Sequence, residues 1–303
     1  MADLRVNVAG VSFENPVIPA SGAFGFGHEY EKLYPLSRLG GISVKGMTRL
    51  PKAGNPPPRI AETPMGMLNS VGLQNPGIDH FIEKELPYLS GKGTRIIANV
   101  AGSTVEDCVA MAEKLEDTAV DMIELNISCP NVKQGGAAFG TSCEAAAGIT
   151  EAVRKATSKP LMVKLSPNVT NITVIAKAVE AAGADAVSLI NTLLGMRIDL
   201  NSRRPVLKNN VGGMSGPAVF PIAVRMVWQV ANAVKIPVVG MGGISSGKDA
   251  IEMMMAGASA VQVGAAIFTD PYAPLKIIDG MNRWLDDHGI ASVREIVGTV
   301  QPW

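Results

Sequence analysis

The sequence has few cysteines, no excess charge of either sign and no long apolar run, and each absence excludes a class of protein. Three cysteines in 303 residues cannot build a disulfide framework, which favours a reducing compartment and, we expect, the cytoplasm. Basic and acidic residues number 27 each, with no basic stripe, so a nucleic-acid partner is not expected. No apolar run is long enough to span a membrane, and the strand-like Met1–Val8 resembles neither a signal peptide nor a membrane anchor.

Familiar catalytic motifs are also missing. The histidines His28, His80 and His288 are far apart, and none is near another plausible ligand, so no metal site is predicted. No Ser-His-Asp set is evident, and the glycine run at 22–27 lacks the G-x-G-x-x-G spacing of a dinucleotide site. The cysteines are too few for a four-cysteine iron–sulfur cluster. The chemistry must therefore come from other groups.

Short apolar runs recur along the whole chain and predict strands. Most of them lack the alternation of a half-exposed strand, as expected where helices cover both faces of a parallel sheet. No linker or compositional break divides the chain, so we expect a single domain spanning residues 1–303. The eight candidates are Pro16–Ala20, Gly41–Gly46, Arg95–Ala101, Asp121–Asn126, Pro160–Ser166, Ala184–Asn191, Ile236–Met241 and Ser259–Ala265.

Helical patterns separate most of these strands. Ser103 with Glu106 predicts a capping box at one helix start, and Ser246 with Asp249 opens another helix. Recurrent βα units favour an α/β fold of the (β/α)8 TIM-barrel type, with a doubly wound open sheet as the alternative. Residues 4–13 predict a β-hairpin that precedes the barrel and caps its lower end.

Three long connections interrupt the regular pattern, at residues 47–79, 129–143 and 192–217. They are rich in Gly, Pro and Asn, and each follows a strand. All three therefore belong on the C-terminal face of a barrel, where catalytic sites form. Long insertions at that face usually make the walls or lids of an active site.

The segment 124–131, Glu-Leu-Asn-Ile-Ser-Cys-Pro-Asn, carries an apolar strand directly into a polar turn that bears a thiol. Ligands of parallel α/β proteins bind at the C-terminal ends of strands, so Cys129 is placed for chemistry rather than packing. Cys108 lies instead on the apolar face of a helix and is expected in the core. Cys143 is near a helix start but has no polar motif around it.

Polar side chains end five consecutive apolar strands: Lys45, Asn99, Asn126, Lys164 and Asn191. All are cationic or uncharged, and an Asn side chain both donates and accepts hydrogen bonds. Together they predict a site for a ring that bears carbonyl and N–H groups and some negative charge. The alternative is that strands simply stop at polar residues by chance.

Two small-residue turns predict a phosphate site. Gly242 and Gly243 follow the seventh strand, and Gly264 and Ala265 end the eighth. These are the barrel positions where backbone N–H groups and a helix N-terminus commonly bind phosphate. An ordinary tight turn between strand and helix is the alternative interpretation.

These motifs together resemble the FMN-dependent dihydroorotate dehydrogenases of pyrimidine biosynthesis, over essentially the whole chain and in family order. Cysteine rather than serine at position 129 resembles the class 1 enzymes. Residues 131–136 resemble the NAD-linked subclass 1B, whose catalytic subunit pairs with an electron-transfer subunit. The motifs are Ser21–Gly27, Lys45-Gly46, Asn69–Asn75, Asn126–Asn131, Lys164, Asn191-Thr192 and Gly242–Ile244.

The resemblance implies a role for each matching residue. Cys129 would be the general base that removes the C5 proton of dihydroorotate, while hydride leaves C6 for N5 of FMN. The substrate would be held by Lys45, Asn69, Ser70, Val71, Gly72, Leu73, Asn126, Asn191 and Thr192. FMN would be held by Ser21, Lys45, Gly46, Asn99, Asn126, Lys164, Ile190, Gly216, Gly242, Gly243, Gly264 and Ala265.

The residue types suit these roles. An anionic substrate needs hydrogen-bond donors, which Lys45 and the backbone of the loop 69–73 can provide. Reduced flavin gathers negative charge at its N1–C2=O edge, and Lys164 would stabilise that charge and raise the redox potential. The pKa of a free thiol lies roughly two units above neutral, so Cys129 as base suits a mildly alkaline pH and a loop that closes over the substrate.

The resemblance also implies a partner. The chain would carry one FMN, and FAD and a [2Fe-2S] cluster would reside on a separate electron-transfer subunit, in a heterotetramer built around a homodimer of this chain. The absence of dinucleotide and iron–sulfur motifs from this sequence agrees with the placement of FAD and the cluster on another subunit. Three alternatives stay open: a fumarate-linked class 1A enzyme, a dihydropyrimidine dehydrogenase-like enzyme, and a non-catalytic barrel that binds a phosphate ligand.

Overall fold

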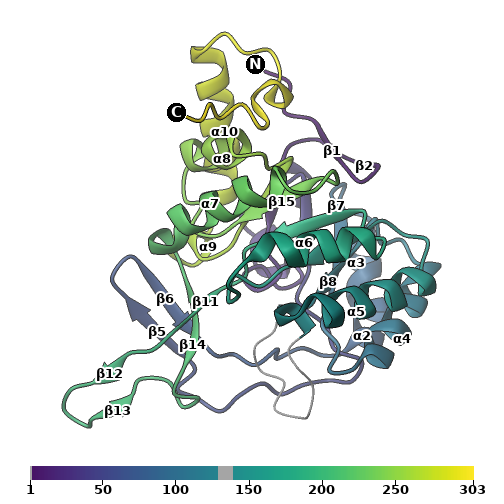
Figure 1. Cartoon of the computed structure of the whole chain (residues 1–303), viewed down its shortest axis with the longest axis vertical. Coiled ribbons are helices and arrows are strands. Elements are labelled where there is room, and N and C mark those ends of the chain that lie inside the picture. Colours follow the sequence, from purple (N-terminus) through teal and green to yellow (C-terminus); the bar gives the residue numbers. More distant parts are fainter. Residues whose placement is uncertain (1, 129–138) are drawn as a thin grey trace.

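Eight parallel strands form the centre of the fold (Figure 1). The structure is a computed structural model that describes residues 2–128 and 139–303. The sheet order is β3-β16-β15-β10-β9-β8-β7-β4, and the Gly40 N–H donates to the Val17 carbonyl at 3.1 Å, which brings β4 beside β3 and nearly closes the ring. The strands are β3 (Val17–Pro19), β4 (Gly41–Ser43), β7 (Arg95–Val100), β8 (Met122–Asn126), β9 (Leu161–Lys164), β10 (Ala186–Leu189), β15 (Val238–Met241) and β16 (Ala260–Val263).

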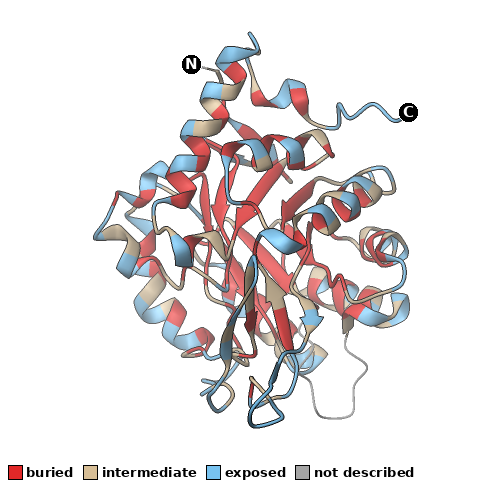
Figure 2. Ribbon diagram, turned by 90° about the vertical axis from the view of Figure 1, so that its left-hand side faces the viewer, coloured by how far each residue is buried: buried red, intermediate tan, exposed pale blue. Residues whose placement is uncertain are grey.

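This order confirms the predicted (β/α)8 barrel and each of the eight predicted strands. Neighbours in the ring follow chain order throughout, so the doubly wound alternative is wrong. Figure 2 shows the strands as a buried centre surrounded by helices that bury one face each. Helix α5 illustrates the pattern, because its buried residues Ala146, Ile149, Thr150 and Val153 follow helical spacing.

The longer helices cover the outside of the barrel. They are α4 (Val105–Glu116), α5 (Cys143–Ala156), α6 (Ile172–Ala181), α7 (Phe220–Ala231), α8 (Gly247–Met255) and α10 (Ala273–Asp287). Shorter helical segments are α1 (His28–Glu31), α2 (Ile78–His80), a π-helical turn (Phe81–Glu85), α3 (Leu86–Ser90), α9 (Ala266–Thr269) and 3-10 turns at Leu36–Arg38, Phe139–Thr141, Pro217–Val219 and Val293–Ile296.

Two predicted helix starts have different outcomes. The capping box of Ser246 and Asp249 at the start of α8 is confirmed. The predicted box at Ser103 and Glu106 is wrong by one residue, because Thr104 adopts the extended backbone of an N-cap and its side chain accepts from the Asp107 N–H.

The predicted N-terminal hairpin is confirmed as β1 (Val6–Val8) and β2 (Val11–Phe13). The Arg95 guanidinium donates from Nε to the Ser12 carbonyl at 2.9 Å. Arg95 is the first residue of β7, so the hairpin packs against the N-terminal ends of the strands. The hairpin therefore lies at the end of the barrel opposite the C-terminal ends of the strands.

A second sheet is a feature that the sequence did not predict. Two of the long connections contribute its four strands, in the order β11-β14-β6-β5. They are β5 (Ile60–Thr63), β6 (Gly66–Asn69), β11 (Leu193–Gly195) and β14 (Gly212–Ser215), and beyond them β12 (Ile198–Asp199) pairs with β13 (Arg204–Pro205). Figure 1 shows this sheet projecting from the barrel.

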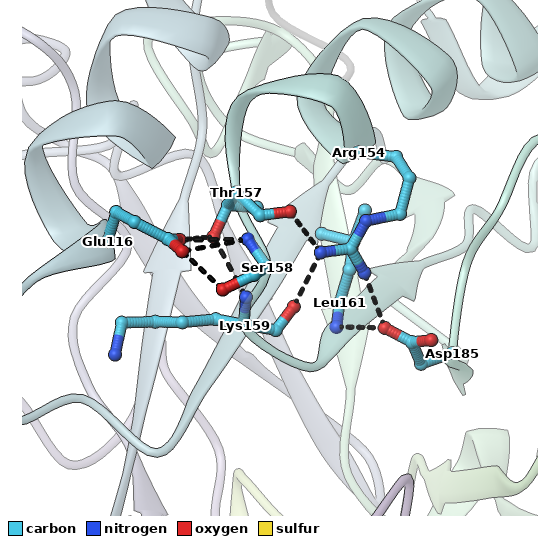
Figure 3. A network of polar contacts seen from close by, with 7 residues as sticks. All are labelled: Glu116, Arg154, Thr157, Ser158, Lys159, Leu161 and Asp185. Carbon is cyan, nitrogen blue, oxygen red and sulfur yellow. Dashed lines mark hydrogen bonds and ion pairs between the residues drawn. The ribbon is translucent and has the colours of Figure 1, made fainter.

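A network of polar contacts ties α4 and α5 to the strands beneath them (Figure 3). The Glu116 carboxylate accepts from the hydroxyls of Thr157 and Ser158 and from the Ser158 N–H at 2.9 Å. The Arg154 guanidinium binds Asp185 at 2.6 Å, and the same carboxylate accepts from the Leu161 N–H at 2.8 Å. Hydrogen bonds from Ser158 and Thr157 lower the pKa of Glu116 from 4.5 to about 2.

We expect Glu116→Gln to lower the melting temperature at neutral pH, because an ionised Glu116 binds Thr157 and Ser158 in the connection between α5 and β9. A carboxyl whose pKa is lower in the folded protein stabilises it above the unfolded pKa and loses that contribution as the pH falls. The difference from wild type should therefore shrink between pH 4.5 and about 2. Thermal unfolding across this range, with the exposed Glu113→Gln on the same helix as control, measures it. A difference that does not depend on pH would contradict this role.

Candidate functional site

A pocket opens at the C-terminal ends of the barrel strands, between the barrel and the second sheet. Every residue that the sequence assigned to substrate or cofactor, and that the structure describes, lines it. These are Ser21, Lys45, Gly46, Asn69, Ser70, Val71, Gly72, Leu73, Asn99, Asn126, Lys164, Ile190, Asn191, Thr192, Gly216, Gly242, Gly243, Gly264 and Ala265. Cys129 lies outside the described residues, and its individual role stays a prediction, as do the roles of the others.

Asn99 and Lys164 form part of the deep wall of the pocket. Asn99 is fully buried and Lys164 is only 5% exposed. The Oδ1 atom of Asn99 has no hydrogen-bond partner among the described residues. A Cβ atom on Gly46 would come within 2.8 Å of this oxygen, so the backbone there can approach Asn99 only because residue 46 is glycine. A buried acceptor without a partner at a pocket wall is suited to a ligand donor.

Glu124 is a buried residue that the sequence analysis missed. Its carboxylate accepts hydrogen bonds from Ser43 Oγ (2.7 Å), Asn99 Nδ2 (2.6 Å), Ser188 Oγ (2.8 Å) and Gln262 Nε2 (2.8 Å). Burial alone would raise the pKa of Glu124, but the Lys164 charge and these hydrogen bonds outweigh it, and the pKa lies below its usual value. An ionised carboxylate therefore lies inside the barrel, behind the pocket.

The loop 69–73 is held in a conformation that glycine makes possible. Gly72 has φ 77°, and a Cβ there would come within 2.6 Å of the Asn55 side chain. The amide of Asn55 donates to the Ser70 carbonyl at 2.8 Å. This loop lines the pocket, and the buried hydroxyl of Ser70 has no hydrogen-bond partner among the described residues.

The turn after β8 is fixed by side chains on both sides. The hydroxyl and N–H of Ser128 donate to Asn126 Oδ1 at 2.6 and 3.2 Å, and Asn191 Nδ2 donates to Ser128 Oγ at 2.5 Å. Asn168, which the sequence analysis did not single out, donates to the Thr192 carbonyl at 3.0 Å. The residue before Cys129 is thereby bound to two strand ends.

The two described cysteines are not among the residues that line the pocket. Cys108 is buried on α4, as predicted, and burial raises the pKa of its thiol to about 12. Cys143 is exposed at the start of α5. Neither is therefore placed to act on a ligand in the pocket.

Comparison with known proteins identifies the family. The profile described as "Dihydroorotate dehydrogenase" matches residues 3–285, which is most of the chain. The chain belongs to the dihydroorotate dehydrogenase family. Similar proteins include "Dihydroorotate dehydrogenase B (NAD(+)), catalytic subunit" of Bacteroides thetaiotaomicron, 56% identical over 99% of this chain and 100% of the relative. The proteins of the same name from Alkaliphilus metalliredigens and Geotalea uraniireducens are 54% and 56% identical, over 98% of this chain in each case.

The pocket of this dihydroorotate dehydrogenase family member fits FMN, the cofactor that the family implies. The free Asn99 oxygen suits a ring N–H, and the Lys164 ammonium suits a ring edge that gathers negative charge. The turns at Gly242-Gly243 and Gly264-Ala265 line the same pocket and could hold a phosphate through backbone N–H groups.

Two features are absent from residues 2–128 and 139–303. Within that part of the chain, no group of three or more His, Cys, Asp or Glu side chains could hold a metal ion. None of the helices described there has the length and apolar character needed to cross a bilayer.

Proposed function

We propose that this chain oxidises dihydroorotate to orotate with FMN, in de novo pyrimidine biosynthesis. The observation that carries the proposal is the pocket, which gathers the two lysines, the strand-end amides and the loop 69–73 around one space. The proposal is also supported by relatives that are named as catalytic subunits of dihydroorotate dehydrogenase B. Their sequences are more than half identical to this one over nearly the whole chain.

The roles of the residues follow from their chemistry. Lys45 and the backbone of loop 69–73 bind the substrate carboxylate, since cations and N–H groups are the donors that an anion needs. Cys129 removes the C5 proton as general base. Bound FMN would supply the acceptor for the hydride that leaves C6. Lys164 would hold the cofactor ring and favour negative charge at its edge, and Asn99 would accept a hydrogen bond from the ring.

We infer that the electrons leave through a partner subunit that carries FAD and a [2Fe-2S] cluster, and that NAD is the final acceptor. The word "subunit" in the names of the relatives supports a partner. We infer further that two copies of this chain form a homodimer within a heterotetramer. We also infer a cytoplasmic location, because the low cysteine content supports a reducing compartment.

The purified chain is expected to be yellow and to release one FMN per subunit on denaturation. The reason is the pair of glycine turns that line the same pocket as Lys164 and Asn99. The visible spectrum and chromatography of the released flavin measure it. FAD in the extract, or a chain that stays colourless after incubation with FMN, would overturn the proposal.

A further inference from the structure

One acid and one base are buried together in the barrel. Among residues 2–128 and 139–303, Glu124 is the one buried carboxylate and Lys164 the one buried amine. They lie on neighbouring strands, β8 and β9, where Asn126 is paired with Lys164. A lone buried charge is costly, and the charge of Lys164 lowers the pKa of Glu124, so the two groups act as counter-charges.

The hydrogen bond to Glu124 also decides which way the Asn99 amide faces. An ionised carboxylate only accepts hydrogen bonds, so Asn99 must turn its NH2 group toward Glu124. The Asn99 oxygen is then left beside Gly46, a residue that lines the pocket, and it is buried and without a partner among the described residues. A neutral amide at position 124 could donate as well as accept, and would no longer impose this orientation.

We propose that Glu124 is a positioning residue for the cofactor: it turns the Asn99 oxygen toward the ring N–H of FMN and supplies the counter-charge to Lys164. The proposal rests on FMN as the cofactor of this pocket. Glu124 acts through its two neighbours and does not line the pocket itself. The Glu124 carboxylate also accepts hydrogen bonds from Ser43, Ser188 and Gln262, which fix its position.

The first test measures the ratio of reduced to oxidised FMN at equilibrium with a reference dye at pH 7. Glu124→Gln removes a negative charge near the ring, and reduction adds negative charge to it, so we expect the ratio to rise about tenfold. Lys164→Met should shift the ratio in the opposite direction, and the double variant should lie between the two single variants.

Ser188→Ala is the matched control, because it removes one hydrogen bond to Glu124 and keeps the carboxylate. Its ratio should stay close to that of the wild type. A ratio in Glu124→Gln that is unchanged or lower would contradict the proposed role of the charge.

The second test does not need a variant of Glu124 that folds. Oxidised FMN has a single ring N–H, at N3, and methylation removes it. The wild-type apoprotein should bind N3-methyl FMN about tenfold or more weakly than FMN, because the Asn99 oxygen loses its donor. Asn99→Leu keeps most of the volume but has no acceptor, so it should discriminate much less between the two flavins. Full discrimination by Asn99→Leu, or none by the wild type, would contradict the proposed orientation.

These outcomes separate the two proposals. A wild-type chain that binds no FMN overturns the proposed function itself. A chain that binds FMN but shows none of the expected shifts overturns only the role of Glu124.

Discussion

Replacing Cys129 with alanine is expected to abolish the oxidation of dihydroorotate while FMN stays bound. The family resemblance implies that the thiol acts on the substrate and not on the cofactor. A positioned general base contributes about 10²–10⁴-fold to a rate, so activity should fall by at least that range. The reaction with an artificial electron acceptor measures turnover, and the flavin absorbance of the same sample measures occupancy.

The controls are a conservative substitution of Cys129 and substitutions of the other two cysteines. Cys129→Ser should keep a little activity that is shifted to higher pH, because a hydroxyl ionises at a far higher pH than a thiol. Cys143→Ala should keep full activity, since Cys143 is exposed and does not line the pocket. Cys108→Ala should change only stability, by about 1 kcal/mol. Equal activity of the wild type and Cys129→Ala at every pH would remove Cys129 from the mechanism.

The isolated chain is expected to oxidise dihydroorotate with artificial acceptors but to reduce NAD only when an electron-transfer subunit is added. Its sequence carries no G-x-G-x-x-G fingerprint and too few cysteines for a four-cysteine cluster. In the proposed function, electrons on FMN reach NAD through a second polypeptide. The rate of NADH formation, with and without a co-purified subunit that bears FAD and an iron–sulfur cluster, measures this.

Two outcomes would contradict this prediction. Rapid NAD reduction by the chain alone would overturn the need for a partner. Rapid fumarate reduction by the chain alone would favour the fumarate-linked class instead. Both outcomes would leave the barrel and the oxidation of dihydroorotate in place.

The barrel was predictable because its strands are covered on both faces. Such strands appear as short apolar runs, and their polar ends identify the catalytic face. Asn126 and Lys164 illustrate this, since each is the last residue of its strand and each lines the pocket.

Glu124 was not predicted, because its side chain does not mark the end of a strand. It lies within the strand Met122–Asn126, two residues before its end, whereas the predicted site used only the last polar residue of each strand. Three of its hydrogen-bond partners, Ser43, Ser188 and Gln262, come from strands far away in the chain. Only the closed barrel brings them together.

The second sheet was missed because its strands carry weak local signals. β14 begins with Gly212 and Gly213, and β5 and β6 are mostly half-exposed. The pairing of β6 with β14 joins residues more than a hundred positions apart, and nothing in either segment alone indicates it.

This pairing has a practical meaning for protein engineering. Asn69 lies opposite Gly213 and Met67 lies opposite Ser215, so one ladder of hydrogen bonds joins the connections 47–79 and 192–217. If only one connection were replaced by the segment of a relative, its strand would pair with an unmatched strand in the other connection. The two connections therefore form a single exchangeable cassette, and a chimera designed to accept a different pyrimidine should replace both together.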